Sequence, residues 1–158
     1  MRRSPRSWFV VAARSVAEPA GGVQPGPSAM FALLEHTTGS DRHWDLLVEV
    51  PGAERLPTWR LAANPLEAAG AVHAERIADH RSVYLEFEGE LTGGRGVVRR
   101  LDRGSAVVET IRPDEAAFVL AGERLRGGFE ITRCASGLVF CRRESPATPG
   151  VGVCSQDG

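Results

Sequence analysis

The stretch FALLEHTTGSDRHWDLLVEV, residues 31–50, indicates which kind of fold the chain forms. Two runs rich in apolar residues, FALLEH and HWDLLVEV, flank the polar segment TTGSDR. This pattern is typical of two strands joined by a turn. A hairpin of this kind would bring His36 back beside His43.

Side chains alternate between the two faces of a strand. In HWDLLVEV the residues expected to face a core are Trp44, Leu46, Val48 and Val50, and those on the opposite face are His43, Asp45, Leu47 and Glu49. We expect the second face not to be needed for packing. An imidazole and a carboxylate would therefore lie side by side on it.

The chain beyond this hairpin repeats the pattern. Short runs rich in branched and aromatic residues are separated by turn-forming residues, and these runs are VYLEFEG, GVVRRLD, AVVETI, AFVLAG, GFEITR and GLVFCRR. Tight turns are expected at DRGS and ASGL. The pattern predicts an all-β, mainly antiparallel fold, a small closed or partly open β-barrel. At most one short helix is expected, at Pro65–Ala78, where the internal Gly70 is unfavourable.

The composition divides the chain into three parts. Residues 30–144 are predicted to form the barrel domain, residues 1–29 a disordered extension and residues 145–158 a disordered tail. Because folded-looking sequence begins abruptly at Phe31, we favour Met30 as the true start. By composition alone, the extension also fits an organelle transit peptide.

The composition also limits the class of protein. The 42% hydrophobic and 25% charged content of the 158 residues is ordinary for a soluble globular protein. No run approaches the roughly 18 to 20 apolar residues needed to cross a bilayer, which argues against an integral membrane protein. The cysteines Cys134, Cys141 and Cys154 lack a CxxC or zinc-type spacing, so we expect reduced thiols in a cytoplasmic protein. A disulfide between Cys134 and Cys141 across ASGL is the less favoured alternative.

Charge is distributed unevenly along the chain. Residues 30–94 hold 5 Arg against 11 Asp and Glu, whereas residues 95–133 hold 8 Arg against 6 acidic residues. The acidic half contains the histidines, and its field suits a divalent cation. The arginines of GRGVVRRLDRG could meet a polyanion, although arginines on a hairpin more often form a solvated face.

The opening hairpin gathers a set of metal-ligand side chains. His36, His43 and Asp45 would supply two nitrogen ligands and one oxygen ligand on adjacent strands. Such a set suits Mn, Fe, Co, Ni or Zn better than Ca or Mg. The alternative is a pair of surface histidines near a turn, with an unrelated salt-bridging aspartate.

A second group of candidate residues lies in ADHRSVYLEFEG. If VYLEFEG is a strand, the core face holds Val83, Leu85 and Phe87, and the opposite face holds Tyr84, Glu86 and Glu88. His80 stands at the strand's entrance, so an imidazole and a phenol would lie beside the metal. The alternative is a tyrosine that packs its ring at the barrel rim.

Several separated blocks resemble one known family. The blocks LEH, RHWDLLVE, Trp59, DHRSVYLEFEG, GGRGVVRRLDRG and GERLRGGFEITR occur in this order over residues 31–133. They resemble the 3'-phosphoesterase domain of bacterial DNA ligase D, and more closely its stand-alone relatives. The resemblance implies a β-barrel that removes 3'-phosphates and 3'-ribonucleotides with Mn²⁺, or with another first-row divalent metal such as Zn²⁺ or Co²⁺. By the same resemblance His36, His43 and Asp45 match the metal ligands, and His80 and Tyr84 match the catalytic residues beside the scissile phosphate.

The chain departs from this family at three cationic positions. Leu47 stands where the family usually has an arginine, and Ala63 stands where the family has a phosphate-contacting lysine. The position of a further arginine of the family falls near Val72 in this chain. Replacement cations are available in Arg60, Arg81 and His73. If Leu47 lies on the same open face as Asp45, Leu47→Arg should raise the activity.

Two functions therefore follow from the sequence. The first is a metal-dependent phosphoesterase that acts on 3' ends of DNA or RNA in DNA repair, with a weakened phosphate clamp. The second is a non-catalytic, metal-containing module that binds nucleic-acid ends or a partner. The expected partners are nucleic-acid 3' ends and a repair ligase or polymerase acting in trans, and the expected state is a monomer.

Overall fold

The computed structural model describes residues 29–144. The predicted disorder of residues 1–28 and 145–158, and the expectation for Cys154, concern residues that lie outside this part. Residue 29 belongs to the first strand rather than to the predicted extension.

The described residues form strands and two short 3₁₀ turns. The strands are β1 (Ala29–Thr38), β2 (Asp41–Val48), β3 (Arg55–Leu61), β4 (Val72–Arg81), β5 (Gly89–Glu90), β6 (Val97–Arg112), β7 (Glu115–Gly122), β8 (Arg126–Cys134) and β9 (Gly137–Arg142). The 3₁₀ turns are η1 (Ser82–Leu85) and η2 (Thr92–Gly94). Neither of these helical turns is long and apolar enough to cross a membrane.

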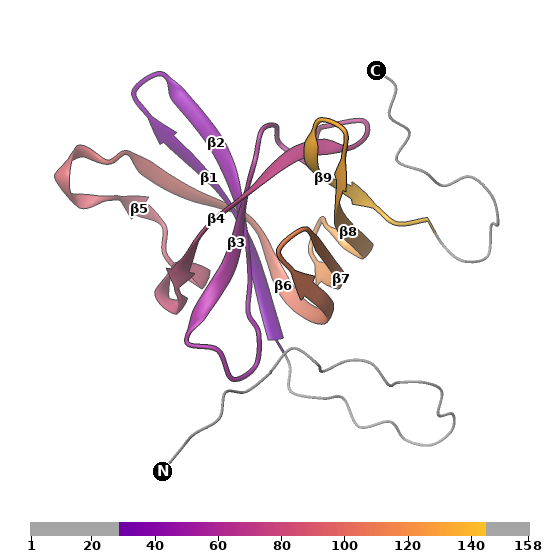
Figure 1. The fold of residues 1–158 in the computed structure, drawn as a ribbon. Coiled ribbons are helices and arrows are strands. Elements are labelled where there is room, and N and C mark those ends of the chain that lie inside the picture. Colours follow the sequence, from indigo (N-terminus) through magenta and orange to yellow (C-terminus); the bar gives the residue numbers. More distant parts are fainter. Residues whose placement is uncertain (1–28, 145–158) are drawn as a thin grey trace, which may run out of the picture.

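The strands close into an antiparallel barrel (Figure 1). The order β1-β2-β3-β4-β9-β8-β7-β6 is closed by pairing of β1 with β6, and the short β5 adds to β6 from outside this ring. Strand β6 is 16 residues long because its first half pairs with β1 and its second half with β7. The prediction of an all-β, antiparallel barrel is confirmed.

The barrel interior holds the main core. Alternate residues of each strand point inward, as in Phe31 and Leu33 of β1 and Leu46 and Val48 of β2, all of which have no exposed surface. The ring of Phe118 contacts Trp59 edge-to-face at 5.5 Å between centroids. Burial of these apolar side chains is the main force that holds the strands together.

A second, smaller core lies on the outer face of β1 and β2. Its buried members are Ala32, Leu34, Leu47, Leu56 and Val98, and Tyr84, Leu85, Phe87 and Leu91 pack against it. The segment 82–91 therefore lies against the outside of the barrel wall. In Figure 1 the region around β5 lies on the side of the barrel away from β8 and β9.

The predicted helix at Pro65–Ala78 is wrong. Residues 72–81 form strand β4, which pairs with β3 on one side and with β9 on the other. The alanine-rich sequence is compatible with a helix, but these ladders use the backbone groups that a helix would need. Residues 65–71 are turns and irregular backbone, and they include Gly70.

Two smaller predictions are also corrected. The segment VYLEFEG is not a strand: it begins in η1, and Val83 is 53% exposed instead of buried. The expected turn at DRGS does not form, because β6 continues through residues 102–105. Gly104 is needed there for close packing, since a Cβ atom on it would lie 2.2 Å from the Ala121 carbonyl oxygen. The turn at ASGL does form, between Cys134 and Gly137.

Cys134 and Cys141 are the two cysteines in the described residues. No disulfide joins Cys134 and Cys141, which face Gly137 and Glu130 across the β8–β9 ladder.

Candidate active site

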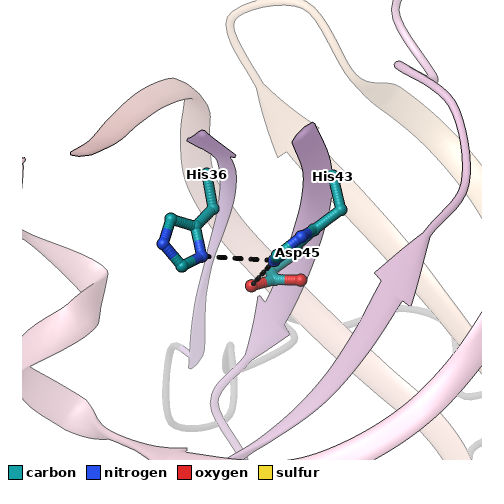
Figure 2. A group of neighbouring side chains, drawn as sticks. All are labelled: His36, His43 and Asp45. Atoms are coloured by element: carbon teal, nitrogen blue, oxygen red, sulfur yellow. Dashed lines mark hydrogen bonds and ion pairs between the residues drawn. The ribbon is translucent and has the colours of Figure 1, made fainter. Parts of the chain in front are cut away.

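The hairpin of β1 and β2 brings the three predicted metal ligands together (Figure 2). His36 and His43 are direct cross-strand partners. The His36 Nδ1 atom lies 3.2 Å from His43 Nε2, which lies 3.5 Å from an Asp45 carboxylate oxygen. One ligand atom from each residue falls within 4.8 Å of the others. The predicted convergence of these side chains is thus found in the structure.

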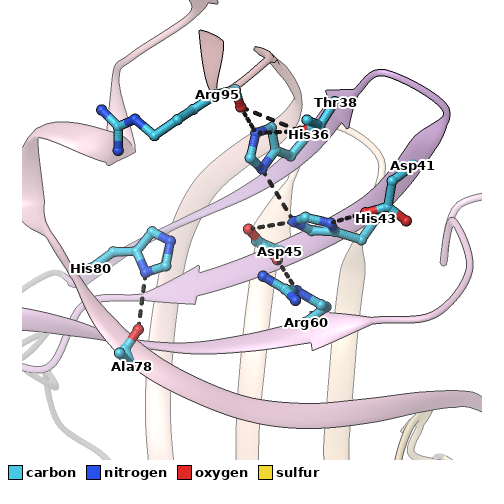
Figure 3. Close-up of polar contacts among 9 residues, drawn as sticks. All are labelled: His36, Thr38, Asp41, His43, Asp45, Arg60, Ala78, His80 and Arg95. Atoms are coloured by element: carbon cyan, nitrogen blue, oxygen red, sulfur yellow. Dashed lines mark hydrogen bonds and ion pairs between the residues drawn. The ribbon is translucent and has the colours of Figure 1, made fainter. Parts of the chain in front are cut away.

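A hydrogen bond determines which ring nitrogen of His36 faces the cluster (Figure 3). His36 Nε2 lies 2.7 Å from the Arg95 carbonyl oxygen. Because a carbonyl oxygen only accepts, Nε2 carries the hydrogen and Nδ1 of the neutral ring presents a lone pair. On the other ring, His43 Nε2 is the nitrogen that faces Asp45, and Nδ1 lies 3.8 Å from an Asp41 oxygen, which is too far for a hydrogen bond.

Asp45 is the buried member of the cluster. The residue is 5% exposed, and its Oδ1 atom has no hydrogen-bond partner among the described residues. Burial raises the pKa of the Asp45 carboxyl, against the opposing charges of His43 and Arg60. Burial also lowers the pKa of His43, which favours its neutral, ligating form. An orphaned buried carboxylate oxygen is costly unless a cation or a donor satisfies it.

The residues present fit a bound divalent metal. Two imidazole nitrogens and one carboxylate oxygen converge, and the 3.2 Å contact between the two rings is favourable only with a hydrogen or a cation between the nitrogens. A set of two nitrogens and one oxygen suits first-row transition metals. The Arg95 carbonyl supplies the second hydrogen bond that metal-binding histidines commonly make through their other ring nitrogen.

A glycine allows the Arg95 carbonyl to approach His36. Gly96 has a φ of +101°, and a Cβ atom on it would lie 2.2 Å from the Thr37 carbonyl oxygen and 3.1 Å from His36 Nε2. Only glycine adopts this backbone conformation readily and leaves the space open. This glycine lies in the GGRG block, which joins the β1–β2 hairpin from far along the chain.

His80 and Tyr84 lie across a cavity from the ligand cluster. The two rings contact edge-to-face, with centroids 5.4 Å apart. His80 Nδ1 donates to the Ala78 carbonyl oxygen at 3.0 Å, so Nε2 is the ring nitrogen that this hydrogen bond does not use (Figure 3). A bulge in the β3–β4 pairing opposite Pro57 precedes His80, and bulges often re-aim side chains at active sites.

The cavity has a volume of about 320 Å³ and a strongly basic wall. Its polar and charged lining residues are His36, Asp45, Arg55, Arg60, Asp79, His80, Arg81, Tyr84 and Arg95. Four arginines thus surround the space between the ligand cluster and His80. A larger hollow of about 810 Å³ lies beside residues 65–72, β8 and β9, and holds none of the predicted site residues.

The arginine cluster predicted from GRGVVRRLDRG is mostly engaged elsewhere. Arg99 donates to the buried carboxylate of Glu35, at 2.9 and 3.1 Å, and Arg42 donates to the same side chain. Burial raises the pKa of Glu35, but the hydrogen bonds and charges of these two arginines lower it overall. Of this cluster, Arg95 lines the cavity.

The expectation that Leu47 lies on an open face is wrong. The alternation of faces was predicted correctly, but Leu47 has no exposed surface and belongs to the second core, with Leu34 and Leu56. Segment 82–91 covers this part of the strand face and leaves the part with Asp45 beside the cavity. An arginine at position 47 would therefore be buried among apolar side chains.

Sequence reasoning missed two contributors to the site. The Arg95 backbone carbonyl and Gly96 leave no signal in side-chain pattern, although the run GGRG marks unusual backbone. Of the three replacement cations considered, Arg60 and Arg81 line the cavity, whereas His73 is exposed on β4 and does not.

The fold and the site together define a small antiparallel β-barrel with a candidate metal centre beside a basic cavity. A sequence model of the DNA ligase D 3'-phosphoesterase domain matches residues 34–133. The chain belongs to this family. A search of curated proteins found no match.

Proposed function

We propose that the chain is a divalent-metal-dependent phosphoesterase that removes terminal phosphate or ribonucleotide groups from 3' ends of nucleic acid during DNA repair. One observation carries the proposal: His36 and Asp45 of the three-residue ligand cluster line one basic cavity together with His80 and Tyr84. Membership of the 3'-phosphoesterase family supports the choice of substrate.

In this proposal His36, His43 and Asp45 hold the metal. When bound, a divalent ion of this kind supplies Lewis-acid activation of a phosphate oxygen and of water. We favour Mn²⁺, and Zn²⁺ and Co²⁺ fit the same ligand set. The Arg95 carbonyl keeps His36 in the tautomer whose Nδ1 can ligate.

His80 and Tyr84 act on the phosphate ester. Attack of water on phosphorus forms one P–O bond, and the bond from phosphorus to the 3' oxygen breaks. The 3' oxygen needs a proton as it leaves, and we assign its delivery to Nε2 of the imidazolium form of His80, because Nδ1 donates to Ala78; the attacking water releases its own proton to solvent. Tyr84, in contact with the His80 ring, orients the phosphate through its hydroxyl group.

The proposal is tested with a DNA primer that ends in a 3'-phosphate. The wild type should release inorganic phosphate in the presence of Mn²⁺, and EDTA should abolish the release. His43→Ala should lose both Mn²⁺ binding, measured by calorimetry, and phosphate release. His80→Ala should retain Mn²⁺ binding and lose release by ~10²-fold or more, the usual scale for a general acid.

His73→Ala is the matched control, because His73 is an exposed histidine on β4 that does not line the cavity. It should leave Mn²⁺ binding and phosphate release unchanged. A wild type that binds Mn²⁺ and 3' ends without releasing phosphate would instead support the non-catalytic module.

A further inference from the structure

We propose that Arg60 of β3 is the residue that holds the terminal phosphate of the substrate. This assignment rests on the proposed function, since it requires a 3'-phosphate in the cavity. The assignment places anion binding on β3, the neighbour of β2. On β2 itself, the position where the family usually has an arginine is occupied by Leu47, which is buried and apolar.

Arg60 lies at the junction between the ligand cluster and the cavity. It is the direct cross-strand partner of Asp45, and its Nε atom is 3.8 Å from Asp45 Oδ1 (Figure 3). The Arg60 side chain is 44% exposed, whereas that of Asp45 is 7% exposed. Arg60 therefore reaches from a buried carboxylate toward the open space that it lines.

The other arginines of the cavity wall have partners that restrain them. Arg55 donates to the Asp79 carbonyl oxygen, Arg95 donates to Thr92, and the Arg81 guanidinium lies 5.9 Å from the centre of the Tyr84 ring. Among the described residues, Arg60 makes its ion pair through Nε, at 3.8 Å from Asp45.

The terminal nitrogens of Arg60 thus have no hydrogen bond to another described residue. A guanidinium with two such nitrogens can bind two phosphate oxygens in a fork, which a lysine cannot do.

The position of Arg60 also suits the rest of the site. His80 lies on β4, the neighbour of β3, and lines the same cavity. A phosphate group between these two strands would meet the Arg60 guanidinium on one side and the His80 imidazole on the other. The positive charge would then lie where negative charge accumulates during hydrolysis.

The test measures selectivity for the phosphate group, and not only turnover. In a His80→Ala background with Mn²⁺, fluorescence anisotropy compares binding of an oligonucleotide with a 3'-phosphate and the same oligonucleotide with a 3'-hydroxyl. We expect a preference for the 3'-phosphate, reduced about 10- to 100-fold by Arg60→Ala, the scale of a lost hydrogen bond to a charged group. Arg60→Lys should retain part of the preference, because it keeps the charge and loses the fork.

Arg112→Ala is the charge-matched control. Arg112 is an exposed residue near the β6–β7 turn, paired with Glu115, and its loss should leave the preference unchanged. Arg60→Ala should also leave the melting temperature and the Mn²⁺ affinity unchanged. A fall in Mn²⁺ affinity would show that Arg60 acts through the metal ligands and would overturn the assignment.

Failure of this assignment can be told apart from failure of the proposed function. If the wild type releases phosphate and Arg60→Ala leaves the preference for the 3'-phosphate unchanged, the assignment is overturned and the phosphoesterase proposal stands. If the wild type releases no phosphate but Arg60→Ala reduces the preference for the 3'-phosphate, the assignment stands and the catalytic proposal is overturned. Absence of any 3'-phosphate preference in the parent overturns the assignment.

Discussion

Asp102 provides the sharpest test of how this barrel is held together. The side chain is 4% exposed and accepts four backbone N–H groups. Oδ1 accepts from Arg103 at 2.9 Å and Glu123 at 2.8 Å, and Oδ2 accepts from Arg124 at 3.0 Å and Leu125 at 2.7 Å. This one carboxylate therefore ties β6 to the turn between β7 and β8.

Asp102→Asn removes half of this acceptor capacity while keeping the shape of the side chain. The amide has one oxygen, so two N–H groups lose their acceptor and face an NH₂ group instead. Each hydrogen bond to a charged group contributes about 1.5 to 3 kcal/mol, so the loss should be about 3 to 6 kcal/mol. That is a large part of the roughly 5 to 15 kcal/mol by which a domain is stable.

Urea unfolding followed by circular dichroism measures this loss. With a slope of about 1 to 3 kcal/mol per molar urea, the Asp102→Asn midpoint should fall by at least about 1 M. Asp114→Asn is the control, because Asp114 pairs with Arg133 on the open surface and its midpoint should barely move. Equal midpoints for the two variants would refute the structural role assigned to Asp102.

Three further predictions concern the site and the cores. Leu47→Arg should lower the free energy of unfolding by about 3 kcal/mol or more and raise no activity, because it buries an unpaired charge, whereas Leu47→Met should unfold near the wild-type urea midpoint. Gly96→Ala should cost about 1 to 3 kcal/mol of stability and weaken Mn²⁺ binding in calorimetry, because its Cβ atom would collide with the backbone beside His36; unchanged Mn²⁺ affinity would contradict this. Phe118→Ala should lower the free energy of unfolding by about 3 to 5 kcal/mol in urea, since Phe118 is fully buried against Trp59, and a loss below about 1 kcal/mol would contradict this packing.

The sequence by itself determined the fold class and the ligand cluster. A strand repeats every two residues, so the run HWDLLVEV already separates His43 and Asp45 from the core residues on the other face. The polar turn after His36 then places this residue opposite His43, as the β1–β2 register confirms. Both inferences depend on residues close together in the chain.

The second group of site residues was predicted by resemblance and placed by the tertiary structure. His80 was expected at the entrance of a strand and lies near the end of β4, two residues beyond the predicted helix Pro65–Ala78. Tyr84 lies in η1 and not in a strand, yet it reaches His80 because segment 82–91 packs on the second core. Local propensity could not show this, since the packing partners are distant in sequence.

Only the tertiary structure decided which residues complete the site and which face of β2 is covered. His36 meets the Arg95 carbonyl across 59 residues of chain, and Asp102 reaches the 123–125 turn across as many as 23. Arg60 is placed beside Asp45 by the register of β2 with β3, and the same sheet buries Leu47 under residues that follow β4. Periodicity reports which face a side chain takes, but it carries no information on what other segment covers that face, because that depends on contacts formed only when the barrel closes.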